Sequence, residues 1–189
     1  MREREQWATW ANGVTMLRLV SGLVVFAYAA DARDETWNYI GLGLYWVLDV
    51  LDGFLARRFD QETRIGAQMD ILADRVLVAF FYLNYATLHP DLIVPVAMFL
   101  FQFMGIDHFL SNQFMRWPIK SPNYFYVIDR TLWRWNWSHP GKALNSGLFA
   151  ILLLVTGWMW LGLAIATALL IMKCVSLGRL LRIGIPVPR

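Results

Sequence analysis

Two pairs of aspartates lie in strongly apolar stretches, where a carboxylate is costly unless it has a partner. Asp49 and Asp52 form one pair, and Asp70 and Asp74 form the other. If each pair lies on a helix, spacings of three and four residues place both carboxylates on one helix face. Two neighbouring helices could then direct four carboxylates into one volume. Carboxylate oxygens suit hard divalent cations, so the sequence predicts a site for two Mg²⁺ or Mn²⁺ ions.

The residues around these pairs follow a longer pattern, D-x2-D-G-x2-A-R-x8-G-x3-D-x3-D, which runs from Asp49 to Asp74. This pattern resembles the signature of the CDP-alcohol phosphotransferase family. Its eight specified positions at fixed offsets are a far more specific signal than a short glycine motif. The alternative interpretation, a solvated acidic face or a set of helix caps, does not explain the apolar flanks. The resemblance implies a metal-dependent membrane transferase of phospholipid biosynthesis, which moves a phosphatidyl group from CDP-diacylglycerol to an alcohol and releases CMP.

The resemblance also implies roles for individual residues. Asp49, Asp52, Asp70 and Asp74 would bind the two ions, with Asp70 bridging them and Asp74 also serving as the general base. The CDP site would combine small residues, an arginine, a loop hydroxyl and an amino-terminal N-x-x-T segment: Gly53, Ala56, Gly66, Arg57, Thr63, Asn12 and Thr15. Two alternatives stay open. The small residues could serve close helix packing, and Asn12 could cap a helix.

The sequence defines the acceptor alcohol less well. The segment DILADR, residues 70–75, resembles the ending found in phosphatidylglycerophosphate and cardiolipin synthases, but Ile71 stands where they usually carry proline. Glycerol 3-phosphate is the leading acceptor, and phosphatidylglycerol, inositol phosphate and serine stay open. A phosphorylated acceptor would need further cations. Membrane anchoring by positive charge explains the available ones equally well, namely Lys142, Lys173, Arg179 and Arg182.

The composition is that of a membrane protein, because 58% of the 189 residues are hydrophobic. We predict an all-α integral membrane protein in which residues 1–189 form a single domain. A bilayer needs about 20 apolar residues per helix, and six segments approach that length: Val14–Ala30, Trp37–Leu55, Gln68–Leu88, Leu92–Leu110, Ala143–Leu161 and Gly162–Leu181. Residues 1–12 predict a short interfacial helix with Trp7 and Trp10 at the membrane surface.

Lysines and arginines gather in alternate connections between these six segments, and the other connections contain only Arg33. By the positive-inside rule, we expect both termini and the active site on the cytoplasmic side of the inner or plasma membrane. The net charge of +3 forms no arginine-rich face that would indicate nucleic-acid binding. The expected partners are therefore CDP-diacylglycerol, an alcohol acceptor and membrane lipids, and a homodimer stays open.

The connection from Ser111 to Gly141 is rich in tryptophan, tyrosine and proline, which is typical of an interfacial layer. A cap over the active site and a dimer contact are alternatives. Two other protein classes also use acidic residues in membranes. The aspartate-rich prenyltransferases lack the D-G-x2-A-R core. In a divalent-cation transporter, Arg57 and the small residues Gly53, Ala56 and Gly66 would have no evident task.

Overall fold

A computed structural model describes residues 5–186, and within that range the chain forms helices and connections with no β-strand. The prediction of an all-α protein is confirmed. The chain divides into two compact units, Met1–Leu88 and His89–Arg189.

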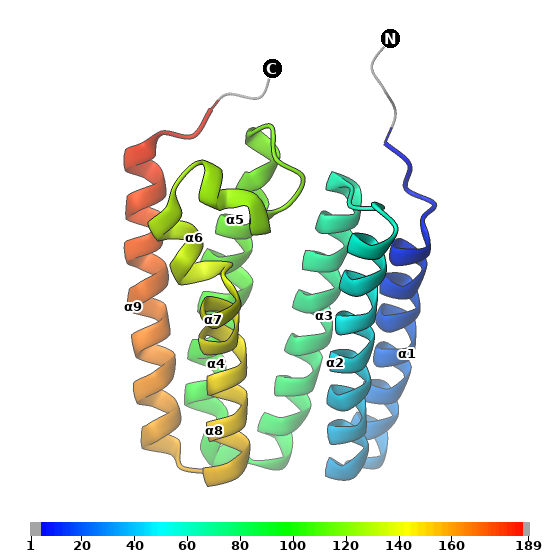
Figure 1. Cartoon of the computed structure of the whole chain (residues 1–189). Coiled ribbons are helices and arrows are strands. Elements are labelled where there is room, and N and C mark those ends of the chain that lie inside the picture. Colours follow the sequence, from blue (N-terminus) through cyan, green and yellow to red (C-terminus); the bar gives the residue numbers. More distant parts are fainter. Residues whose placement is uncertain (1–4, 187–189) are drawn as a thin grey trace. The chain divides into compact units, whose positions relative to one another are not determined.

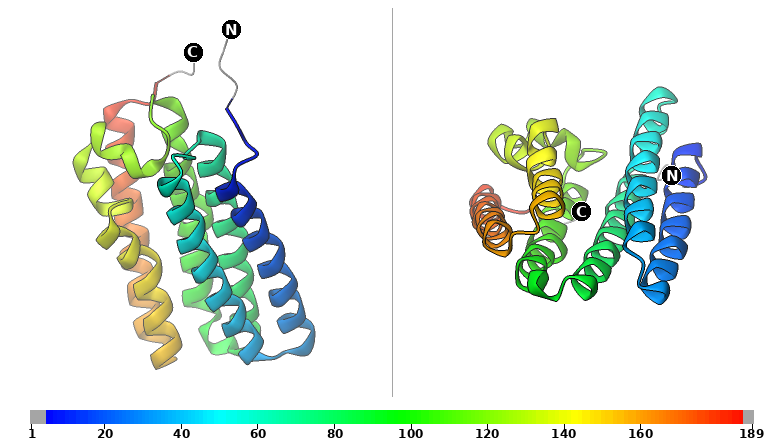
Figure 2. Two further views of the ribbon diagram at one scale, coloured as in Figure 1. Left: turned by 45° about the vertical axis from the view of Figure 1, so that its right-hand side comes forward. Right: turned by 90° about the horizontal axis from the view of Figure 1, so that it is seen from below.

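The first unit consists of three long helices, α1 (Trp10–Ala32), α2 (Glu35–Arg58) and α3 (Arg64–Leu88). Short connections join them, so consecutive helices run antiparallel, and α1 packs against both α2 and α3 (Figures 1 and 2). The side chain of Asp34 accepts hydrogen bonds from the backbone N–H groups of Thr36 and Trp37, which satisfies free donors at the start of α2. The three helices thus form a bundle in which any one helix faces the other two.

Glycines allow α1 to approach its neighbours closely. A Cβ atom on Gly22 would lie 2.7 Å from the side chain of Leu77, and one on Gly41 would lie 2.5 Å from the ring of Phe26. Small residues of this kind are common where membrane helices pack. The Asn84 side chain adds a buried hydrogen bond across the bundle, donated to the backbone carbonyl of Phe26 at 2.9 Å. These contacts fix the helix register that positions the aspartates.

The second unit begins with an unbroken helical run from Pro90 to Arg116. This run contains a π-helical turn and comprises η1 (Pro90–Leu92), α4 (Ile93–Phe101), η2 (Gln102–Asp107), α5 (His108–Asn112) and η3 (Gln113–Arg116). The remaining elements are η4 (Pro122–Val127), α6 (Arg130–Asn136), α7 (His139–Lys142), η5 (Ala143–Leu148), α8 (Phe149–Thr156) and α9 (Met159–Ile183). α9 packs against α4, α6 and α8.

A buried ion pair links the elements of this second unit. The Lys173 ammonium on α9 lies 2.5 Å from a carboxylate oxygen of Asp107 and 2.8 Å from the amide oxygen of Asn136. Asn136 in turn donates to the hydroxyl of Ser176 at 3.0 Å. Lys173 is therefore buried and already paired with Asp107. Of the four cations considered from the sequence, it is the least suitable to bind an acceptor phosphate.

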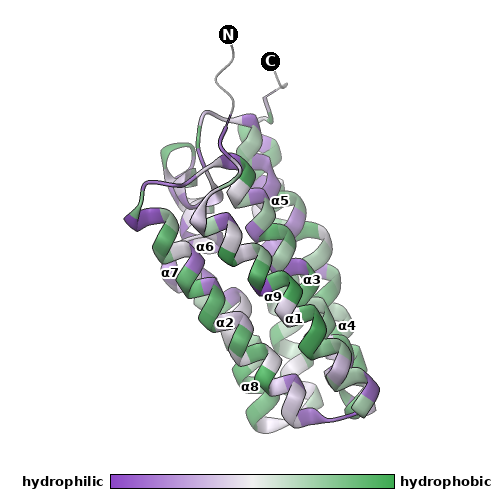
Figure 3. Cartoon of the chain, turned by 90° about the vertical axis from the view of Figure 1, so that its right-hand side faces the viewer, coloured by the Kyte–Doolittle hydropathy of each residue, from purple (hydrophilic) through white to green (hydrophobic). Residues whose placement is uncertain are grey.

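Five helical segments are long and apolar enough to cross a membrane: Trp10–Ala32, Glu35–Arg58, Arg64–Leu88, Pro90–Arg116 and Met159–Ile183. Figure 3 shows hydrophobic residues along these helices and polar residues gathered near their ends. An integral membrane protein is thus supported, but the predicted count of six spans is not confirmed. The predicted fifth span, residues 143–161, ends early, because Gly157 adopts a left-handed φ of 56° and terminates α8 at Thr156.

The predicted amino-terminal interfacial helix is wrong for residues 5–9, and its first four residues lie outside the described part of the chain. The Thr9 side chain accepts a hydrogen bond from the Asn12 N–H, so Thr9 caps α1 and the helix begins at Trp10. Asn12 is therefore inside the helix and is not its cap. The preceding residues instead reach the start of α3, where the Glu5 carboxylate accepts from the Ile65 N–H at 3.2 Å.

The tryptophan-rich connection has secondary structure and a core of its own. Phe114, Phe125 and Leu132 are fully buried within it. The indole of Trp133 donates to the backbone carbonyl of Asn123 at 2.8 Å. The connection is thus a packed set of short helices, and its placement at a membrane interface stays a prediction.

Candidate metal centre

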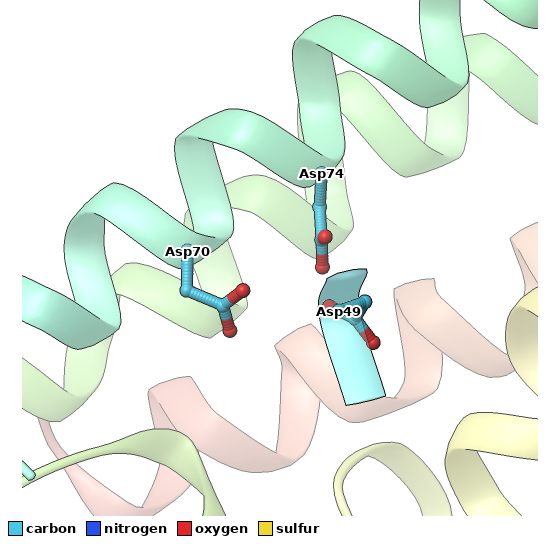
Figure 4. Close-up of side chains that lie close together, drawn as sticks. All are labelled: Asp49, Asp70 and Asp74. Atoms are coloured by element: carbon cyan, nitrogen blue, oxygen red, sulfur yellow. The ribbon is translucent and has the colours of Figure 1, made fainter. Parts of the chain in front are cut away.

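Three of the four predicted metal ligands converge in the first unit. Asp49 of α2 and Asp70 and Asp74 of α3 each offer a carboxylate oxygen within 4.8 Å of the other two. Figure 4 shows their side chains directed toward a common space. Their side chains are 40%, 43% and 29% exposed, respectively, so a cation could reach them. A set of carboxylate oxygens at this separation fits a hard divalent cation such as Mg²⁺ or Mn²⁺.

Helical spacing explains this convergence. Asp70 and Asp74 are four residues apart on α3, and Tyr45 and Asp49 are four residues apart on α2, so each pair shares a helix face. The packing of α2 against α3 turns the two faces toward each other. The Tyr45 hydroxyl donates a hydrogen bond to a carboxylate oxygen of Asp74 at 3.1 Å and thereby connects the two helices.

Asp52, the fourth predicted ligand, lies deeper than the other three. Its side chain is only 7% exposed, and one of its oxygens accepts a hydrogen bond from the Thr15 hydroxyl at 2.8 Å. Thr15 itself is buried in α1. Thr15 thus orients the Asp52 carboxylate. The sequence predicted Thr15 as part of the CDP site and did not predict this contact.

A buried arginine from α1 contacts all four carboxylates. The Arg18 side chain is fully buried, and its Nη1 atom pairs with Asp49 and lies 3.4 Å from an oxygen of Asp52. Its Nη2 atom lies 2.7 Å from Asp70 and 3.3 Å from Asp74. The guanidinium also lies over the Tyr45 ring, 5.5 Å from its centroid. A planar group with five N–H donors suits such multiple contacts with carboxylates.

Arg18 and Tyr45 are absent from the residues predicted by the sequence. Arg18 falls inside the predicted first span, and an ionisable residue within an apolar span is by itself a functional candidate. It also follows Thr15 by three residues and therefore shares its helix face. The sequence therefore contained a reason to select Arg18. Its carboxylate partners could not be predicted, because they depend on how α1 packs against α2 and α3.

The predicted CDP-site residues of α2 lie beside the carboxylates. The nearest neighbour of Gly53 in space is Arg57, since a Cβ atom placed on Gly53 would lie 3.2 Å from the Arg57 guanidinium. Arg57 is exposed, and Ala56 is half-buried. A cation of the type that binds phosphate thus lies beside the helix backbone at Gly53.

The remaining predicted CDP-site residues meet at the junction of α1 and α3. A Cβ atom on Gly66 would lie 2.6 Å from the Asn12 amide oxygen and 3.0 Å from the Thr63 hydroxyl. The Thr63 hydroxyl accepts a hydrogen bond from the Gly66 N–H, and the Asn12 amide donates to the backbone carbonyl of Trp7. For Gly66, the close-packing alternative therefore has direct support.

Two of the predicted acceptor cations line one open cavity of about 470 Å³ in the second unit. Its lining comprises Asp129, Trp135, Val175, Gly178, Arg179, Arg182 and Ile183. Arg179 holds Asp129 through two hydrogen bonds from Nε, both 3.0 Å long. Burial raises the pKa of Asp129, but hydrogen bonds from Arg179 and the backbone outweigh it and lower that pKa below its ordinary value. Lys142 is exposed and is not part of this lining.

The chain belongs to the CDP-alcohol phosphatidyltransferase family, whose family model matches residues 8–172. That match includes all four aspartates, Arg18 and every residue predicted for the CDP site. Membership separates the chain from the prenyltransferase and cation-transporter classes that the sequence had left as alternatives.

Three curated relatives illustrate the range of this similarity. A CDP-diacylglycerol–glycerol-3-phosphate 3-phosphatidyltransferase from Cereibacter sphaeroides is 33% identical over 109 residues, which is 53% of this chain and 49% of the relative. A protein of the same name from Aquifex aeolicus is 41% identical over 90 residues, 47% of this chain and 49% of the relative. A CDP-diacylglycerol–inositol 3-phosphatidyltransferase from Candida albicans is 30% identical over 80 residues, 42% of this chain and 34% of the relative.

The chain thus spans about half the length, or less, of these curated relatives. No solved structure matches the chain.

Proposed function

We propose that this chain is a divalent-metal-dependent transferase that moves a phosphatidyl group from CDP-diacylglycerol to glycerol 3-phosphate and releases CMP. The observation that carries the proposal is the convergence of Asp49, Asp70 and Asp74 within one small volume, in a chain of this family. Relatives named for transfer to glycerol 3-phosphate support this acceptor. The relative named for transfer to inositol makes a second alcohol the natural comparison.

The proposed metal ligands are the three converging aspartates together with Asp52. Mg²⁺ or Mn²⁺ bound there would neutralise the diphosphate of the substrate and stabilise the leaving phosphate. We infer two ions, in line with the four carboxylates. Asp70 is the proposed ligand shared by both ions, the role that the family resemblance implies for this position.

In the proposed reaction, the acceptor hydroxyl oxygen bonds to the phosphorus that carries diacylglycerol. The bond from that phosphorus to the bridging oxygen of the diphosphate breaks, and CMP leaves with this oxygen. The hydroxyl proton passes to the Asp74 carboxylate, the proposed general base. The hydrogen bond from Tyr45 and the contact from Arg18 both involve Oδ1 of Asp74 and hold this carboxylate in place. Asp74 therefore combines positioning with proton transfer.

The nucleotide is proposed to lie along α2 at Gly53 and Ala56, with Arg57 on its phosphates. The atoms nearest to a side chain added at Gly53 belong to the flexible end of Arg57, which supports close approach by a ligand once Arg57 moves onto its phosphates. Asn12, Thr15, Thr63 and Gly66 would then border the site. Their proposed part is to hold the α2–α3 connection and Asp52 in place.

The phosphate of the acceptor is proposed to bind in the cavity lined by Arg179 and Arg182. Arg182 is exposed, and no ion pair is recorded for it among the described residues. Arg179 is already paired with Asp129, so Arg182 is the better candidate to contact an incoming phosphate. Hydrogen bonds to charged groups contribute roughly 1.5–3 kcal/mol each.

The proposed location is a bacterial-type inner or plasma membrane, with both termini and the site on the cytoplasmic side. The alternating distribution of lysine and arginine in the sequence supports this orientation. CDP-diacylglycerol would reach the site from the bilayer, and a homodimer stays open.

The test is to incubate the purified protein with CDP-diacylglycerol, Mn²⁺ and each candidate acceptor in turn, and to identify the lipid product. We expect phosphatidylglycerophosphate from glycerol 3-phosphate. A product formed only from phosphatidylglycerol, inositol, inositol phosphate or serine would reassign the acceptor. The absence of CMP release with every acceptor would contradict the transferase itself.

A second measurement examines the acceptor contact. Arg182→Gln should raise the KM for glycerol 3-phosphate by about tenfold or more, since 1.4 kcal/mol corresponds to one decade, with little change in the KM for CDP-diacylglycerol. Lys142→Gln is the matched control, because Lys142 is exposed but does not line the cavity. An unchanged KM for the acceptor in Arg182→Gln would contradict the phosphate site.

A further inference from the structure

Arg18 lies against the carboxylate cluster and pairs with its members. Its guanidinium is fully buried and lies within ion-pair distance of both aspartates of α2 and both aspartates of α3. It comes from the third helix, α1, so one side chain ties all three helices of the unit together. Four carboxylates and one guanidinium leave the cluster with a net charge of −3 when all are ionised.

Arg18 contacts the same three carboxylates that could hold a divalent ion. Nη1 is paired with Oδ1 of Asp49, and Nη2 lies 2.7 Å from Oδ1 of Asp70 and 3.3 Å from Oδ1 of Asp74. Asp49, Asp70 and Asp74 are also the residues whose oxygens lie within 4.8 Å of one another. A positive group and a divalent ion at such short range repel each other strongly. The guanidinium and a divalent ion therefore compete for these three carboxylates.

Like charges at this separation also destabilise the protein when no cation is present. Arg18 reduces that repulsion. Because Arg18 is buried, salt only weakly screens its attraction to the carboxylates. Its Nε atom has no hydrogen-bond partner among the described residues. The guanidinium is therefore held chiefly through Nη1 and Nη2, the atoms that face the carboxylates.

We propose that Arg18 is a resident counter-cation of the metal centre, which keeps the four carboxylates together without metal and which divalent ions must displace from their oxygens. This role rests on the metal-binding part of the proposed function. It makes Arg18 a positioning residue that sets the affinity of the centre for divalent ions. Arg18 stabilises the metal-free protein and weakens the binding of the first ion. Removal of its charge should have opposite effects on these two properties.

The experiment measures thermal stability and Mn²⁺ binding of the purified full chain in detergent, without substrate. Arg18→Gln should lower the Tm of the metal-free protein and should shift the Mn²⁺ titration midpoint to a concentration lower by about tenfold or more. Arg18→Lys keeps the charge but loses the planar fork, so its midpoint should lie between those of the wild type and Arg18→Gln. Arg58→Gln is the matched control, because Arg58 is exposed at the end of α2, and its midpoint should not change.

The direction of the shift separates this role from a merely structural one. Damage to the packing of α1 would weaken Mn²⁺ binding, whereas relief of competition strengthens it. An unchanged or weaker midpoint in Arg18→Gln would overturn the proposal, as would the absence of any Mn²⁺ response in both proteins. If Arg18→Gln does not fold, the double variant Arg18→Gln/Asp49→Asn keeps the net charge at −3 and should recover a folded metal-free protein; failure to recover it would also overturn the proposal.

Failure of the proposed function gives a different result. A wild-type protein that binds Mn²⁺ but releases no CMP with any acceptor would contradict the transferase. The predicted Arg18→Gln shift could still appear in that protein, and the counter-cation role would then stand by itself.

Discussion

Gly53 and Gly66 belong to one sequence pattern but have different surroundings. The nearest neighbour of a side chain added at Gly53 would be the flexible end of Arg57, whereas Gly66 is packed against Asn12 and Thr63. Gly53→Leu should therefore leave the Tm nearly unchanged and weaken CMP binding, because the new side chain occupies the proposed nucleotide space. The measurement is a CMP titration by thermal shift in the presence of Mn²⁺, since a ligand of the folded state raises the Tm by mass action.

Gly66→Ala is the matched comparison for that variant. Its new methyl group would crowd the Asn12 amide at 2.6 Å, and overpacking of this kind costs about 1 kcal/mol or more. We expect a lower Tm without CMP for Gly66→Ala. If Gly53→Leu instead bound CMP like the wild type, Gly53 would serve only helix packing.

At the scale of helices, the long segments were predictable because each depends on a local run of apolar residues. The predicted second span begins at Trp37, two residues after the observed start of α2 at Glu35. The Asp34 cap extends the helix beyond the apolar stretch. The convergence of Asp70 with Asp74 was predictable in the same way, because a four-residue spacing acts within one helix.

Features that depend on contacts between helices were not predictable from spacing. Arg18 finds its partners only when α1 packs on α2 and α3, and the deep position of Asp52 follows from its hydrogen bond to Thr15 on another helix. Residues 5–9 do not form the amphipathic helix that the tryptophans indicated, and Glu5 instead accepts a hydrogen bond from Ile65 at the start of α3.

The segment from His139 to Thr156 decides how many times the chain crosses the membrane. It is a continuous helical run of 18 residues through α7, η5 and α8. At 1.5 Å per residue it would extend about 27 Å, close to the roughly 30 Å of a bilayer core. Its first turns are polar, which explains why it is absent from the five segments that are apolar enough to span. We expect it to cross the membrane, in agreement with the six predicted spans.

Thiol labelling tests this expectation at Trp158, an exposed residue in the turn between α8 and α9. In a Cys174→Ser background, Trp158→Cys should react with a membrane-impermeant maleimide from the outer side of intact cells. Phe59→Cys, in the connection between α2 and α3, should react only in inside-out vesicles. Labelling of both positions from the same side would contradict a sixth span.

For the molecule as a whole, the central claim is that the carboxylates of α2 and α3 form the metal centre of a phosphatidyl transfer. The most direct test is the rate of CMP release from CDP-diacylglycerol and glycerol 3-phosphate at saturating Mn²⁺, measured for the wild type, Asp70→Asn and Arg58→Gln. Asp70→Asn should insert into the membrane normally but lose about 10²-fold or more in rate, because it removes a charge from the centre of the cluster. Arg58→Gln should retain the wild-type rate. Near-native turnover in Asp70→Asn would contradict the assignment of this cluster as the catalytic metal centre.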